Sequence, residues 1–139
     1  GEVGLADEPE VGIMPVDCGA GASSPFLQGV PSSVEVLQWH SAEVRRPPAD
    51  ARVLASSSRC RVQAMSVGQR AFSMQFHVEI TAATVPEWHA IPEYRAALTR
   101  SLGADGAERL REDAAAHLAG FNALAGLLYR NWREACGLL

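Results

Sequence analysis

The order of patterns along the chain predicts an α/β fold in which strands come first and helices last. Short β-prone runs alternate with turns over residues 1–80, and the last third has apolar residues at helical spacing. Strands this close together leave no room for crossover helices, so they must pair largely antiparallel or extend the edge of a larger sheet. The order fits an α+β fold or the C-terminal part of an α/β domain. We prefer the second, because helices that all follow the strands suit a sheet whose first half lies elsewhere.

Five short strands are expected in the first part of the chain. A stretch rich in glycine, proline and serine, Cys18–Ser33, predicts a surface loop, and Arg45–Asp50 predicts a turn. Gly68 is expected to join the last two strands as a hairpin. The strands are expected at Val11–Val16, Val34–Trp39, Arg52–Ser56, Arg61–Val67 and Gln69–Phe76.

Two helices are expected after the strands, at Glu93–Leu102 and Glu108–Tyr129, and the second pattern can be followed to Glu134. Gly103 and Gly106 punctuate the join between them. We therefore expect residues 1–139 to form one partial domain, strand-rich over 1–80 and helical over 86–136.

Composition excludes several classes of function. The net charge is −4 and no basic run is present, which argues against a nucleic-acid partner. The three cysteines are widely spaced, so neither a disulfide framework nor a zinc site is indicated, and a reducing, cytoplasmic setting is the simpler interpretation. No apolar run reaches the length of a membrane span, and the acidic N-terminal residues do not form a signal-peptide pattern. We expect no membrane partner.

The sequence His77-Val78-Glu79 is the strongest chemical signal in the chain. Side chains alternate along a strand, so His77 and Glu79 are expected to share one face. A carboxylate there can accept a hydrogen bond from one imidazole nitrogen, which leaves the other nitrogen free to act as a base. On spacing alone, a strand-end histidine beside a solvated glutamate explains the pattern equally well.

A series of further motifs surrounds this pair. In order they are Gln38-Trp39-His40-Ser41, Arg46-Pro47-Pro48-Ala49, Leu54-Ala55-Ser56-Ser57-Ser58-Arg59-Cys60, Gln63-Ala64-Met65 and Met74-Gln75-Phe76-His77-Val78-Glu79. The series resembles the C-terminal half of class I glutamine amidotransferases, and it is most similar to their stand-alone, GMP-synthase-like branch. Residues 1–79 resemble the family closely and the later helices more loosely.

The resemblance implies a flavodoxin-like α/β fold and a Cys-His-Glu triad that releases ammonia from glutamine. His77 and Glu79 match the base and its orienting acid, and Ser41 and Ala42 match backbone positions that hold the substrate. His40 would line the same region. The chemistry implied needs neither a metal nor a cofactor, and the ammonia would pass to a synthetase or ligase partner or be released.

Two departures from the family pattern affect these expectations. Val78 replaces the usual proline between the histidine and the glutamate, which should matter little to either role. The family's nucleophile-elbow cysteine precedes a Gly-Gly-x-Val segment, and the chain matches that segment from Gly1, so the elbow is expected to be absent. Cys18, Cys60 and Cys136 do not match it. The chain should then supply histidine and glutamate alone, be inactive by itself, and dimerise or need its other half.

Two alternatives remain open at this stage. One is a relative similar to γ-glutamyl hydrolases, with a γ-glutamyl small molecule as substrate in place of glutamine. The other is a non-catalytic binding or scaffold module of the same fold.

Overall fold

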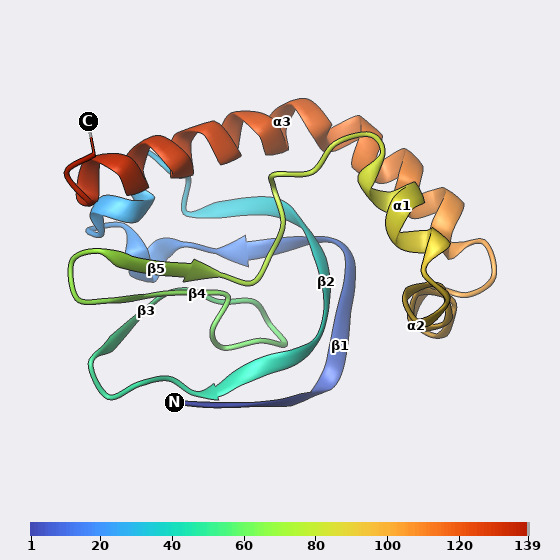
Figure 1. The fold of residues 1–139 in the computed structure, drawn as a ribbon, viewed down its shortest axis with the longest axis horizontal. Coiled ribbons are helices and arrows are strands. Elements are labelled where there is room, and N and C mark those ends of the chain that lie inside the picture. Colours follow the sequence, from blue (N-terminus) through green and yellow to red (C-terminus); the bar gives the residue numbers. More distant parts are fainter. Residues whose placement is uncertain (139) are drawn as a thin grey trace.

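The computed structural model describes residues 1–138 and shows two antiparallel sheets followed by helices. In the first sheet, β1 (Glu2–Asp17) pairs with β2 (Ser33–Arg46). The second sheet has the order β3 (Ala51–Ala55), β4 (Ala64–Val67), β5 (Ala71–Met74), with β4 in the centre (Figure 1). Every strand pairing is antiparallel, which confirms the prediction from the short spacing of the strands.

Two isolated antiparallel bridges join the sheets at their edges. Asp17, at the end of β1, pairs with Ser56, just after β3. Leu37 in β2 pairs with His77, after β5, through hydrogen bonds from each amide to the other carbonyl, at 3.1 and 2.8 Å. Each sheet is therefore joined to the other along both of its outer strands, and the second bridge fixes the backbone of His77.

Several strand boundaries differ from the prediction. Strands β1 and β2 are much longer than expected, because residues of low β propensity at their outer ends are held by pairing, as between Glu2 and Arg46. Strand β5 ends at Met74, short of the predicted Phe76. The expected surface loop contains two 3-10 helices, η1 (Gly19–Gly21) and η2 (Pro25–Leu27), and Phe26 in η2 is 2% exposed, so that segment belongs partly to the core.

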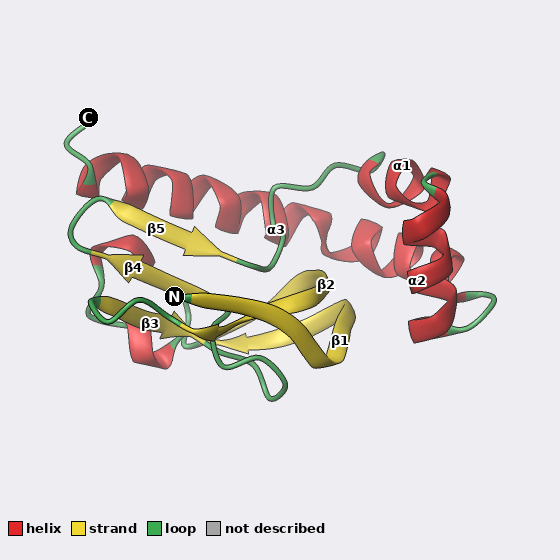
Figure 2. Cartoon of the chain, turned by 60° about the horizontal axis from the view of Figure 1, so that its bottom comes forward, coloured by secondary structure: helices red, strands yellow, loops and turns green. Residues whose placement is uncertain are grey.

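Three helices follow the strands: α1 (Thr84–Ala90), α2 (Pro92–Leu102) and α3 (Gly106–Ala135). The two predicted helices are confirmed as α2 and α3, whereas α1 was not expected as a separate helix. Helix α3 lies along the sheets, and α1 and α2 pack near its N-terminal part (Figures 1 and 2). Its buried apolar residues form one stripe at helical spacing: Leu110, Ala114, Phe121 and Leu128.

Asn131 fastens the C-terminal part of α3 to the region around η2. Its side-chain amide donates to the carbonyls of Phe26, at 3.2 Å, and Gln28, at 2.8 Å. These bonds join segments more than 100 residues apart in sequence and satisfy a buried polar side chain. Within residues 1–138, no helix combines the length and the apolar character that a membrane crossing requires.

Candidate active site

His77 and Glu79 lie in the irregular segment that follows β5, not on a regular strand as expected. They nevertheless meet: His77 Nδ1 is 2.8 Å from Glu79 Oε1. The other carboxylate oxygen, Oε2, accepts a hydrogen bond from the amide of Val78 at 2.9 Å. If Nδ1 carries the proton and donates it to the carboxylate, Nε2 is left as the basic nitrogen. The arrangement can therefore act as an oriented general base.

The electrostatics of Glu79 favour its charged form. Partial burial is the largest single influence and raises the pKa of this carboxyl group. The hydrogen bond from His77 and those from the amides of Glu79 and Val78 together outweigh burial, so the pKa of Glu79 lies below its ordinary value. Glu79 is thus an anion at neutral pH and can stabilise a protonated His77.

Acid should remove the contribution of Glu79 to stability. Because the folded-state pKa is lowered, the contribution is fully present above the unfolded-state pKa and is lost as the pH falls through the folded-state pKa. The side chain is 56% exposed, so this contribution should not exceed about 1 kcal/mol. Urea unfolding of the chain and of its Glu79→Gln variant should show a stability difference at about pH 7 that shrinks at about pH 3. An equal difference at both pH values would contradict this assignment.

The predicted substrate-binding positions lie beside His77. A cavity of about 1010 Å³ is lined by His77, His40, Ser41 and Ala42, whereas Glu79 is not part of its wall. Ser41 and Ala42 are exposed to it, and His40 is partly buried at its edge. The structure therefore brings four of the five predicted site residues to one cavity, with the fifth directly behind His77.

Aromatic residues form another wall of this cavity. The ring of Trp88, from α1, stands edge-on to that of His77, with centroids 5.1 Å apart. Trp88 also packs edge-on against Trp39 of β2 at 5.1 Å, and Tyr94 of α2 lies 6.3 Å from Trp39. Helices α1 and α2 thereby hold an apolar surface beside the imidazole. From the sequence, Trp39 and Trp88 are expected only to pack, and their place in the cavity is not predicted.

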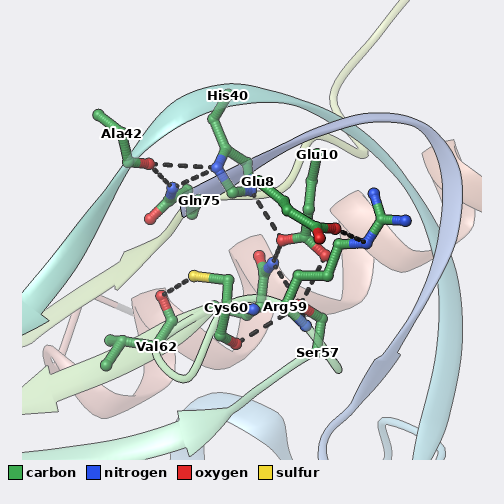
Figure 3. A network of polar contacts seen from close by, with 10 residues as sticks. Glu8, Glu10, His40, Ala42, Ser57, Arg59, Cys60, Val62 and Gln75 are labelled. Carbon is green, nitrogen blue, oxygen red and sulfur yellow. Dashed lines mark hydrogen bonds and ion pairs between the residues drawn. The ribbon is translucent and has the colours of Figure 1, made fainter. Parts of the chain in front are cut away.

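A buried polar network lies behind His40, and sequence reasoning missed its central member, Glu10 (Figure 3). Glu10 is 1% exposed, and its carboxylate lies 3.2 Å from His40 Nε2. On the other side of the ring, Nδ1 is 2.7 Å from the side-chain nitrogen of Gln75 and 3.2 Å from the carbonyl oxygen of Ala42. Burial is the largest influence on the pKa of His40 and lowers it, against the opposing effects of Glu10 and the Ala42 carbonyl. His40 is therefore neutral near pH 7.

The three cysteines lie away from this cavity. None of them is among its lining residues within the part of the chain that the structure describes. Burial and the neighbouring Asp17 raise the pKa of the Cys18 thiol to about 11, and burial is the main cause that raises the pKa of Cys60. Cys136 donates weakly to the carbonyl of Arg70 at 3.4 Å. Cys18 and Cys60 are thus thiols, not thiolates, at neutral pH.

The residues of the site do not suggest a metal centre. Across residues 1–138, no three histidine, cysteine, aspartate or glutamate side chains gather in a way that could hold a metal ion.

Comparison with known proteins gives consistent matches over much of the chain. Residues 8–87 match the family described as "Glutamine amidotransferase class-I". A subunit of the glutamine-hydrolyzing GMP synthase from Sulfolobus acidocaldarius is 38% identical over 81 residues, which cover 58% of this chain and 42% of that protein. The equivalent subunit from Sulfurisphaera tokodaii is 36% identical over the same shares. The chain thus spans less than half the length of these curated relatives.

Solved structures share the fold. A glutamine amidotransferase from Methylobacillus flagellatus superposes with a TM-score of 0.79 at 24% identity, covering 96% of this chain and 55% of that one. A glutamine amidotransferase from Thermotoga maritima gives 0.76 at 23% identity, with 97% and 54% covered. Nearly the whole chain therefore corresponds to about half of a larger fold.

Proposed function

The chain belongs to the class-I glutamine amidotransferase family, and from this membership we propose that it supplies the base and the orienting acid for hydrolysis of the side-chain amide of glutamine. The observation that carries the proposal is the 2.8 Å contact between His77 Nδ1 and Glu79 Oε1, with His77 on the wall of the cavity. Residues 1–139 would form the C-terminal part of a flavodoxin-like domain, strand-rich over 1–80 and helical over 86–136.

In the proposed reaction, a cysteine thiolate attacks the amide carbon of glutamine and forms a tetrahedral intermediate. Protonated His77 gives its proton to the departing ammonia as the carbon–nitrogen bond breaks, which leaves a thioester. His77 Nε2 then takes a proton from water, whose oxygen attacks the thioester and releases glutamate and the thiolate. Glu79 orients the imidazole and stabilises its charged form.

We propose that the thiolate comes from a segment outside residues 1–139. Cys18 and Cys60 are buried and have raised pKa values, whereas a reactive cysteine needs a lowered one. Cys136 lies at the C-terminal end of α3, beside Arg70 and not in the cavity of His77. The chain on its own would then be inactive.

The backbone of Ser41 and Ala42, with His40 behind it, would hold the substrate in the cavity. Since the archaeal relatives are named as subunits of a glutamine-hydrolyzing GMP synthase, we extend the proposal to a partner. The ammonia released would pass to a synthetase subunit.

Ammonia release from glutamine tests this function. We would assay the complete gene product that contains this chain, the chain of residues 1–139 alone, and the gene product carrying Cys18→Ala, Cys60→Ala or Cys136→Ala. The gene product and its three cysteine variants should release ammonia at similar rates, because none of these thiols is in the cavity. The isolated chain should release none.

Other results would change the assignment. Activity in the isolated chain that disappears in one cysteine variant would make that cysteine the nucleophile. An inactive gene product would contradict the use of glutamine, and γ-glutamyl compounds would then be assayed in its place. Inactivity with these as well would leave a binding or scaffold role.

A further inference from the structure

Glu10 is a carboxylate buried in the interior of the protein, where charged groups persist only when they are fully paired. Its Oε1 accepts a hydrogen bond from the hydroxyl of Ser57 at 2.7 Å, and its Oε2 accepts one from the side-chain amide of Gln63 at 2.7 Å. Ser57 is itself fixed, because its oxygen accepts a hydrogen bond from the amide of Cys60 at 2.9 Å. The carboxylate is therefore held rigidly on its buried side.

The remaining neighbour of this carboxylate is His40, and the surrounding groups define which ring nitrogen carries the proton. The side-chain nitrogen of Gln75 donates to the carbonyl of Ala42, which identifies that atom as the amide nitrogen and not the oxygen. The same nitrogen lies 2.7 Å from His40 Nδ1, so Nδ1 must accept. The proton of the neutral ring is then on Nε2, which faces Glu10 at 3.2 Å in an angled contact.

The network connects the buried carboxylate to the cavity. Figure 3 shows contacts that run from Glu10 through His40 to Gln75 and the carbonyl of Ala42. Ala42 and its neighbour Ser41 are exposed to the cavity beside His77. The network thus ends on the peptide segment that, on the proposed function, lies against the substrate.

We propose that Glu10 is a positioning residue: through the Nε2–H form of His40 and the amide of Gln75, it fixes the Ser41–Ala42 backbone for substrate binding. The inference rests on the proposed function for the identity of the substrate. Glu10 takes no part in bond making, and its removal should weaken substrate binding more than the chemical step. The network explains why an acidic side chain is kept in the interior beside this cavity.

The first test reads the proton on His40 without any catalysis. Long-range nitrogen–proton NMR correlations on the 139-residue chain distinguish the two ring forms. We expect Nε2–H for His40 in the unaltered chain. In Gln75→Leu the donor to Nδ1 is lost, and the Ala42 carbonyl, 3.2 Å away, is left to attract a proton to Nδ1. The ring should then shift toward Nδ1–H.

The second test measures glutamine hydrolysis by the complete gene product. Glu10→Ala and Gln75→Leu should each raise KM about three- to tenfold, with kcat changed less than about twofold. Glu10→Gln should restore KM to within about twofold of the unaltered value, because the amide oxygen can still accept from His40. Glu2→Gln, on the same strand but exposed and paired with Arg46, is the matched control and should change neither constant.

Gln75→Leu keeps the test decisive if Glu10→Ala does not fold, because Gln75 is partly exposed and outside the buried side of the network. Nδ1–H in the unaltered chain would overturn the inference, and so would an unchanged KM in Gln75→Leu or a fall in kcat alone. If the unaltered gene product does not hydrolyse glutamine, the proposed function fails. The NMR result then decides alone whether Glu10 positions this segment.

Discussion

Replacement of His77 by alanine is expected to lower kcat for ammonia release from glutamine by about a thousandfold or more. The imidazole would both protonate the leaving ammonia and activate water, so its loss removes proton transfer from both halves of the reaction. Alanine also frees the Glu79 carboxylate from its 2.8 Å contact. The measurement is steady-state ammonia release by the complete gene product with and without the substitution.

His117→Ala is a matched control for this substitution. His117 lies on α3, where its ring stacks on Phe121 and its Nε2 is 3.4 Å from Glu35. It does not line the cavity of His77, so its loss should leave kcat within about twofold. If His77→Ala retained a rate close to that of His117→Ala, His77 would not be the base.

Leu37→Ala should destabilise the fold by about 2–5 kcal/mol. Leu37 is fully buried in β2, and it is the residue whose backbone pairs with His77 across the junction of the sheets. The substitution removes apolar contacts and leaves a cavity next to this junction. Urea unfolding of the 139-residue chain, followed by circular dichroism, measures the effect.

The same substitution at an exposed leucine separates burial from composition. Leu5 lies on β1, the partner strand of β2, and is 73% exposed. Leu5→Ala should change the free energy of unfolding by no more than about 0.5 kcal/mol. Equal losses in the two variants would show that Leu37 does not belong to a packed core.

The His77–Glu79 pair could be predicted because a spacing of two residues is local information. The meeting of the two side chains did not require a regular strand, since β5 ends at Met74 and the contact forms beyond it. Glu10 could not be predicted in the same way. An acidic side chain in a strand normally indicates a solvated face, and the partners that allow its burial, Ser57 and Gln63, lie about 50 residues further along the chain.

The same distinction explains the fold. Helices α2 and α3 were predicted to within a few residues, because helical periodicity is written into consecutive residues. The lengths of β1 and β2 were underestimated, because pairs such as Val3 with Val44 stabilise strand conformation from across the sheet. The burial of η2 depends on Asn131, more than 100 residues away, and no local pattern announces it.

The bridge between Leu37 and His77 has a consequence for dynamics. Each amide of the pair is bonded to the other's carbonyl, so neither can exchange its hydrogen with solvent until the junction of the two sheets opens. The two amides should therefore exchange at similar rates, as members of one cooperative unit, while amides at the frayed outer end of β1 exchange faster. Opening of this junction would also displace the imidazole from its partners, so the population of exchange-competent states sets a limit on how long the base stays assembled.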